Sequence, residues 1–234
     1  MDFINLTWIV VFLIAIYVLQ GFYRGFLVSA TNTVGMAISW CVGFLFSPLM
    51  SQAIAKGTFY RFILNFTNGV DQLQASGNLA VATLSTEQIK QIVSSANLPM
   101  PFDHLVTENM TNGVFEAQGF HKVSEYFGFT MTNVVVNIFS FLVIYLIARI
   151  VIALLVNAFN YATPLPVLRR FDSLAGGAVG LLRGFLGMFA LFMIVPVLMI
   201  ALPADFVSPI IDKSPIAAFF YQSNFLLNGI SGVI

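Results

Sequence analysis

Charged side chains are scarce in this sequence. Lysine, arginine, aspartate and glutamate make up 9% of the 234 residues, whereas a soluble domain carries about 25%. Hydrophobic residues make up 59%, and the mean hydropathy is +0.91. A soluble domain of middle size still exposes about 30% of its unfolded-chain surface, so a water-soluble fold could not hide this much apolar surface. The composition predicts that lipid is the solvent for much of the chain, which makes the bilayer its first partner.

Cysteine pairs, a charge imbalance and the common cofactor motifs are missing as well. The single cysteine, Cys41, cannot form an internal disulfide, and we expect it to be a small buried hydrophobe. Ten basic and ten acidic residues cancel, so no global field attracts nucleic acid. Without a phosphate-binding glycine loop, a Cys-x-x-Cys pair or a basic–aromatic patch, we expect no cofactor and no nucleic-acid partner.

Long stretches without charge locate the membrane segments. A charge in the hydrocarbon core costs about 3 kcal/mol, and about 20 residues make one helical span. The runs predict an all-α integral membrane bundle of four transmembrane helices, at residues 4–22, 26–50, 130–148 (extending to 159) and 174–202. Residues 4–22 are expected to be a span and not a cleaved signal peptide, because no basic residue precedes them and no small-residue cleavage site follows.

The predicted organisation has four parts: helices one and two in 1–50, a polar extracytoplasmic insertion in 51–129, helices three and four in 130–202, and a C-terminal segment in 203–234. Ser85-Thr-Glu-Gln88 is a capping box that predicts a short helix ending before Asn97. Phe59, Ile63 and their neighbours predict a further amphipathic helix, either prolonging helix two or lying in the interface. For 203–234 we favour an interfacial helix beginning at Ser214-Pro215 over a fifth span.

Basic residues near the span ends predict the orientation. Cytoplasmic connections carry an excess of lysine and arginine, whereas long loops cross largely regardless of charge. Arg24 lies between helices one and two, and Arg149, Arg169, Arg170 and Arg183 lie in or beside the connection between helices three and four. Both short connections are therefore predicted to be cytoplasmic, and both termini and the middle segment extracytoplasmic.

Small residues at four-residue spacing predict helix contact faces, because close approach drives helix association in lipid. One stripe, on helix two, consists of Thr31, Gly35, Ser39, Gly43 and Ser47. The other, on helix four, consists of Gly176, Gly180 and Gly184. Each face could act within the bundle or between subunits, so a homo-oligomer stays open.

A heptapeptide pattern occurs twice, as Gly21-Phe-Tyr-Arg-Gly-Phe-Leu27 and as Gly180-Leu-Leu-Arg-Gly-Phe-Leu186. The two copies indicate an internal repeat of helix pairs, or chance in a sequence rich in these residues. Arg24, Arg149 and Arg183 could all snorkel to the cytoplasmic interface, or Arg149 and Arg183 could face the bundle interior. In the second case Asp172 is the expected partner of Arg149 and Arg183, because it is the one acid predicted on that side.

With the corner Gly21–Phe26 and the stretch Phe171–Gly184 in hand, the chain resembles the colicin V production (CvpA) family of bacterial inner-membrane proteins. The resemblance covers roughly 4–200 and excludes the long 51–129 insertion. It implies a cytoplasmic-membrane protein linked to toxin production or export and to envelope homeostasis, and it supplies no catalytic residue. The motif positions form our candidate site: Gly21, Arg24, Gly25, Arg149, Asp172, Gly176, Gly180, Arg183 and Gly184.

The sequence offers little for an enzyme or a metal site. Gly229-Ile-Ser-Gly232 matches the Gly-x-Ser-Gly of intramembrane proteases, but no span carries a histidine to act as base. His104 and His121 each precede a glutamate by four residues, which is too few ligands for a closed metal site. We therefore expect a non-enzymatic accessory protein that contacts itself or secretion and envelope membrane proteins. The alternative is a small oligomeric channel or solute transporter.

Overall fold

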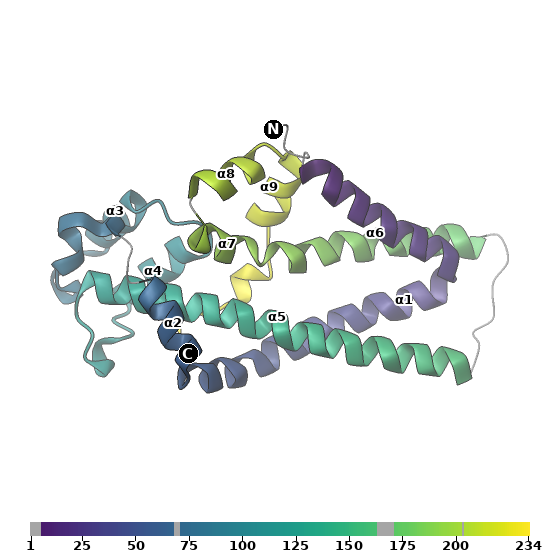
Figure 1. Ribbon diagram of the computed structural model, residues 1–234, viewed down its shortest axis with the longest axis horizontal. Coiled ribbons are helices and arrows are strands. Elements are labelled where there is room, and N and C mark those ends of the chain that lie inside the picture. The colour runs from purple at the N-terminus through teal and green to yellow at the C-terminus, as the bar shows by residue number, and fades with distance from the viewer. Residues whose placement is uncertain (1–5, 68–70, 163–170, 203) are drawn as a thin grey trace.

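The computed structural model describes residues 6–67, 71–162, 171–202 and 204–234. All elements in these ranges are helical (Figure 1). Three helices are long and apolar enough to cross a membrane: α1 (Leu6–Ala55), α5 (Val123–Ala162), and α6 (Phe171–Phe192) taken together with α7 (Val195–Ala201). The predicted all-α membrane fold is confirmed. Arg169 and Arg170, used in the orientation prediction, lie outside the described residues.

Helix α1 contains the first two predicted spans as two helical limbs that meet at a kink. Its backbone leaves the helical region at Gly25, which has φ 76° and ψ 175°. Such a conformation is open essentially only to glycine. The ribbon reverses direction there, so that a first limb (residues 6–24) and a second limb (residues 26–55) form a V (Figure 1). The first two predicted segments are therefore helical over their described residues.

The predicted fourth helix is interrupted. α6 ends at Phe192, a turn follows at residues 193–194, and α7 begins at Val195. Pro196 stands in the first turn of α7. Proline has no amide hydrogen, and its ring clashes with the carbonyl four residues earlier, which here belongs to Phe192. The uninterrupted helix predicted over 174–202 is therefore wrong at this point.

Helix α1 buries mostly small and polar residues and exposes large apolar ones. Ser29, Asn32, Ser39 and Ser47 on α1 are buried, whereas large apolar residues such as Leu45 point outward. Soluble proteins show the opposite arrangement, and only lipid makes an apolar outer surface favourable. Cys41 is exposed on this surface, so the expectation that it is buried is wrong.

The small-residue stripe of helix two packs against α5. A side chain at Gly35 would meet Ile152, and one at Gly43 would meet Phe141, both on α5. Ser39 and Ser47 are buried on the same face. Thr31, the first member of the predicted stripe, is exposed. The stripe thus serves contacts inside the chain.

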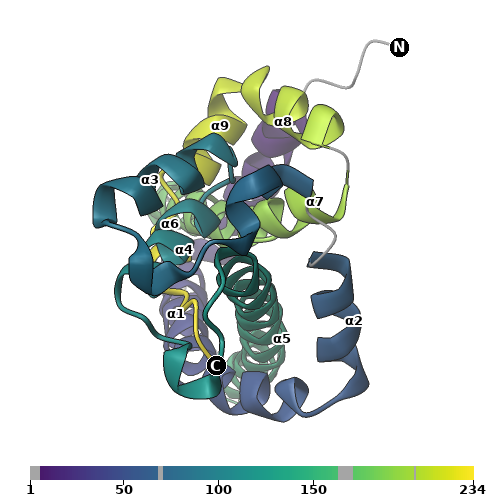
Figure 2. The same ribbon diagram turned by 90° about the vertical axis from the view of Figure 1, so that its left-hand side faces the viewer.

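The middle segment packs as a cap on the bundle end opposite Gly25 (Figures 1 and 2). Its helices are α2 (Thr58–Thr67), η1 (Asp71–Asn78), η2 (Val81–Thr83), α3 (Thr86–Ser95), α4 (Phe102–Thr111) and η3 (Glu116–Gln118). α3 begins after Ser85, where the predicted capping box is formed, and ends before Asn97. Figure 2 shows α2 beside α5 as a separate helix. Val93, Val106 and Phe102 share one apolar core with α5, so the cap is part of the bundle.

The C-terminal segment folds back over the same end. It contains α8 (Ala204–Asp212), α9 (Pro215–Gln222) and η4 (Leu227–Gly229). α9 begins at the predicted position, and the Ser214 hydroxyl accepts a hydrogen bond from the amide of Ala217. Tyr221 connects this helix to the cap, because its hydroxyl donates a hydrogen bond to the carbonyl of Met100 at 2.9 Å. Burial raises the pKa of this hydroxyl.

Candidate functional site

The first limb of α1 crosses α6 at backbone contact. A Cβ added at Gly21 would collide with the carbonyl of Gly176, and one added at Gly180 would collide with the carbonyl of Tyr17. The same reasoning applies to Gly176, where a Cβ would lie 2.6 Å from the carbonyl carbon of Gly25. Glycine at these positions lets the two helices approach more closely than any side chain would allow.

The corner at Gly25 is fixed by the start of α6. The backbone amide of Phe26 donates to Oδ1 of Asp172 at 3.0 Å, and the Ser173 hydroxyl donates to the carbonyl of Phe22 at 2.9 Å. The Asp172 carboxylate fills the space that a side chain at Gly25 would need. Asp172 therefore binds an amide that the break in α1 leaves without a helical partner. Within the described residues, the Asp172 carboxylate thus binds a backbone amide and does not form the expected ion pair with an arginine.

Arg183 lies inside the bundle. Its exposed fraction is 2%. One terminal nitrogen, Nη2, donates to Oε1 of Gln20 at 3.1 Å, and the guanidinium carbon lies 5.2 Å from the centre of the Tyr17 ring. Its Nε is buried without a hydrogen-bond partner. Of the two alternatives left by the sequence, Arg183 therefore takes the interior one.

Arg149 points into the same interior from α5. Its Nη1 lies 3.9 Å from the position of a Cβ at Gly35 and is buried without a partner. Within the described ranges, no ion pair joins either arginine to a carboxylate. Two cations thus point into the interior, and no carboxylate of the described part of the chain balances their charge.

The two copies of the heptapeptide occupy different places. Arg24 is exposed at the corner, next to the non-helical Gly25. Its counterpart Arg183 is buried within the uninterrupted helix α6, next to Gly184, which packs against Tyr17. A structural repeat would place both copies in equivalent positions, so the internal-repeat interpretation is wrong.

A polar cluster that we did not predict holds the end of the chain. Asn137 on α5 donates to the carbonyls of Ser231 and Val233 at 2.7 and 3.1 Å. One turn away, Asn133 donates to the carbonyl of Gly232 at 3.3 Å, and Asn109 of α4 donates to the same oxygen at 3.1 Å. The available signal was two asparagines four residues apart in an apolar helix, since polar residues there usually bind a neighbour.

The same asparagines connect the cap to the bundle. Asn133 accepts a hydrogen bond from the hydroxyl of Tyr60 at 2.8 Å. Burial raises the pKa of Tyr60 to about 12, so this hydroxyl is protonated and donates at neutral pH. The hydrogen bonds from Asn109, Asn133 and Asn137 hold the C-terminal residues against α4 and α5. Leu227 and Ile230 are buried in this segment.

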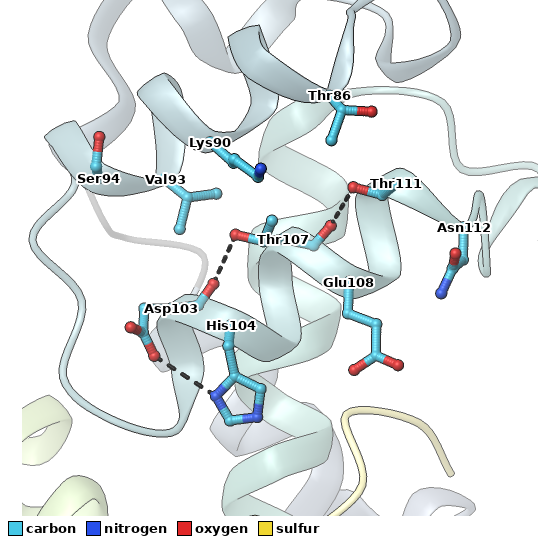
Figure 3. Close-up of a pocket in the computed structure, with 10 residues that line it drawn as sticks. All are labelled: Thr86, Lys90, Val93, Ser94, Asp103, His104, Thr107, Glu108, Thr111 and Asn112. Atoms are coloured by element: carbon cyan, nitrogen blue, oxygen red, sulfur yellow. Dashed lines mark hydrogen bonds and ion pairs between the residues drawn. The ribbon is translucent and has the colours of Figure 1, made fainter. Parts of the chain in front are cut away.

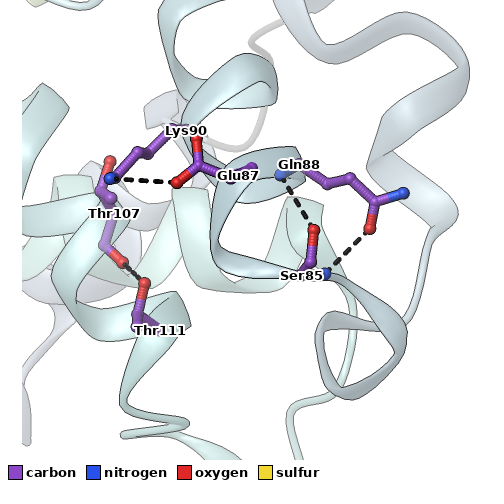
Figure 4. A network of polar contacts seen from close by, with 6 residues as sticks. All are labelled: Ser85, Glu87, Gln88, Lys90, Thr107 and Thr111. Atoms are coloured by element: carbon purple, nitrogen blue, oxygen red, sulfur yellow. Dashed lines mark hydrogen bonds and ion pairs between the residues drawn. The ribbon is translucent and has the colours of Figure 1, made fainter.

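A pocket of about 600 Å³ lies on the cap between α3 and α4 (Figure 3). Its hydroxyl groups are engaged by their own helix: Thr107 donates to the carbonyl of Asp103, and Thr111 to that of Thr107. Lys90 pairs with Glu87 at 3.5 Å beside the Ser85 capping box (Figure 4). Imidazole Nδ1 of His104 lies 3.7 Å from Asp103, and both are about half exposed. These contacts describe a solvated surface and not a prepared ligand site.

The second histidine–glutamate pair has a local structural role. The carboxylate of Glu125 accepts hydrogen bonds from the backbone amides of His121 and Lys122, at 2.8 and 2.9 Å. It caps the beginning of α5 in this way. Among the described residues, no group of three potential metal ligands comes together.

Comparison with known proteins identifies a family. Residues 111–224 match the model of the family described as colicin V production protein. The match includes the motif from Asp172 to Gly184 and the last part of the predicted insertion, and it does not extend to the Gly21–Phe26 corner. No curated protein and no solved structure matches the chain. This match, over residues 111–224, supports the resemblance to the colicin V production protein family that the sequence motifs indicated.

Proposed function

We propose that this chain is a non-enzymatic accessory protein of the cytoplasmic membrane, serving toxin production or export and envelope homeostasis. The family name indicates the toxin connection. The observation that carries the accessory role is the backbone-tight crossing of α1 and α6, locked by Asp172. A rigid bundle of this kind suits a scaffold that presents fixed surfaces to other membrane proteins.

The non-enzymatic part of the proposal rests on the contacts of Ser231, the serine of the Gly-x-Ser-Gly motif at residues 229–232. The Ser231 hydroxyl accepts a hydrogen bond from the amide of Val233 at 3.1 Å, and the Ser231 carbonyl is held by Asn137. Both contacts give this serine a structural task at the locked C-terminus. A nucleophilic serine would instead need a base within hydrogen-bond reach.

We further propose four membrane crossings, with the corner at Gly25 in the cytoplasm and both termini outside. Two features support this orientation: exposed Arg24 lies at the corner, and the cap lies at the opposite end of the bundle (Figure 1). Positive residues near short connections favour the cytoplasmic side.

The helix faces that already pack within the chain indicate which surfaces remain for a partner. The glycines of α6 and the small residues of α1 are occupied by contacts within the chain. A partner, whether a second copy or a secretion or envelope protein, therefore contacts the outward apolar faces or the cap. Leu154 on α5, with 63% of its surface exposed, represents the first surface, and Ser95 on α3 represents the second.

Site-specific photo-crosslinking in native membranes tests the accessory role. A benzophenone side chain at Leu154 or at Ser95 is expected to capture a discrete protein partner, identified by mass spectrometry. The matched control is Met36, which is buried in the same bundle and should give no intermolecular product. Failure to capture any protein from either exposed position, with the chain folded and in the membrane, would contradict the proposal.

A second candidate function is a small oligomeric channel or solute transporter. The observation that favours it is the interior position of Arg183 and Arg149, because ionisable residues inside a membrane bundle commonly mark a polar path. This candidate predicts solute or ion flux in proteoliposomes that Arg183→Gln alters. Flux equal to that of empty liposomes would exclude it.

A further inference from the structure

Arg183 is buried and Arg149 is half-buried, and each has a buried nitrogen that demands an acceptor. Arg183 Nε and Arg149 Nη1 are buried donors without a hydrogen-bond partner. Arginine has no acceptor atom and keeps its proton in proteins. A buried charge left unpaired is strongly unfavourable, so neither deprotonation nor the contacts present balance this pair.

The two side chains occupy comparable depths in the bundle. Arg183 lies on the Tyr17 ring, and Tyr17 is eight residues before the corner, or about 12 Å along the first limb at 1.5 Å per residue. Arg149 faces Gly35, ten residues after the corner, or about 15 Å along the second limb. The hydrocarbon layer is about 30 Å thick. Both side chains therefore lie near the middle of the bundle.

Among the residues that the structure describes, no group recorded in contact with either arginine supplies a negative charge. Arg183 touches the Gln20 amide oxygen and the Tyr17 ring, and both groups are neutral. Asp172 is engaged by the amide of Phe26 at the corner. It lies eleven residues, or about 16 Å of helix, from Arg183.

We propose that Arg183 and Arg149 form a binding site for a small inorganic anion, such as chloride, in the membrane interior between α1, α5 and α6. The anion accepts from Nε of Arg183 and from Nη1 of Arg149 and offsets their mutual repulsion. A small anion fits best, because the Tyr17 ring and the Gln20 amide already contact the Arg183 guanidinium, and Nη1 of Arg149 lies against Gly35. The site concerns binding alone and holds under either proposed function.

The test measures thermal unfolding of the full-length protein, purified in a neutral detergent. Sodium chloride replaces sodium gluconate stepwise at constant ionic strength. A bound anion stabilises the folded state by mass action, so we expect a saturable rise in Tm of about 5 °C or more at one hundred times the dissociation constant. Arg183→Gln and, independently, Arg149→Gln should each remove the rise. Arg24→Gln, which changes an exposed arginine at the corner, should keep it.

Three results would overturn the proposal. The first is a wild-type Tm that does not change between gluconate and chloride. The second is a rise in Tm with chloride in Arg183→Gln and Arg149→Gln that equals the rise in the wild-type protein. The third is a stabilisation by phosphatidylglycerol micelles that replaces the chloride effect, because the arginines would then bind a lipid headgroup. If Arg183→Gln does not fold, the comparison of Arg149→Gln with Arg24→Gln decides alone.

Discussion

Gly180→Ala is the sharpest test of the helix crossing. A Cβ at this position collides with the Tyr17 carbonyl and would also lie 3.1 Å from the Tyr17 carbonyl carbon and 3.2 Å from Cα of Gly21. These obstacles are backbone atoms, so relief requires the first limb of α1 to move away from α6. Inserting an extra methyl group into a packed site typically costs about 1–3 kcal/mol.

Gly187→Ala is the matched control in the same helix. A Cβ there would find its nearest neighbour, the Tyr17 hydroxyl, at 3.5 Å, which is ordinary van der Waals contact. Both substitutions gain the same helix propensity, about 0.5–1 kcal/mol over glycine. That gain cancels in the comparison, and the difference between the two variants isolates the crossing.

The assay is unfolding of the detergent-solubilised protein by increasing sodium dodecyl sulfate, followed by far-ultraviolet circular dichroism. We expect Gly180→Ala to be less stable than Gly187→Ala by about 1–3 kcal/mol. Equal stabilities would refute the reasoning, because they would mean that α1 and α6 are not in backbone contact at Gly180.

Three further substitutions test the corner and the C-terminus. Gly25→Ala should destabilise more than Gly119→Ala in the same assay: both have positive φ, but only Gly25 has a carboxylate in the way. Asp172→Ala removes a hydrogen bond from a charged acceptor and should cost about 1.5–3 kcal/mol; wild-type stability would contradict the corner lock. Asn137→Ala should speed amide hydrogen exchange at 229–234, measured by mass spectrometry, whereas Asn65→Ala, at an exposed site on α2, should not. Unchanged exchange in Asn137→Ala would mean that the hydrogen bonds of Asn137 do not hold residues 229–234 in place.

Local signals made much of the fold predictable. Charge is so costly in lipid that the runs without it coincide with helices α1, α5 and α6. The capping box at Ser85 and the proline after Ser214 depend on neighbouring residues alone, and both helices begin where these residues predict. The glycine stripes indicated contact faces, and the contacts of Gly176 and Gly180 within the chain agree with one of the two alternatives left open.

The errors arise where distant parts of the chain meet. Asp172 was expected to pair with an arginine because of its charge. It accepts a hydrogen bond from the backbone amide of Phe26 instead, next to the break at Gly25. Asn137 and Ser231 are separated by 94 residues, so no local pattern relates them. Cys41 was expected inside because it is apolar, but lipid removes the reason to bury an apolar side chain.

The central claim is that the helices cross a bilayer, with the corner and the cap on opposite sides. In a Cys41→Ser background, single cysteines at Tyr23, which is 93% exposed beside the corner, and at Ser95 on the cap are labelled in intact cells with a membrane-impermeant maleimide. The account predicts that Ser95→Cys reacts in intact cells and that Tyr23→Cys reacts only after permeabilisation. Reaction of both positions from the same side of the membrane would contradict it.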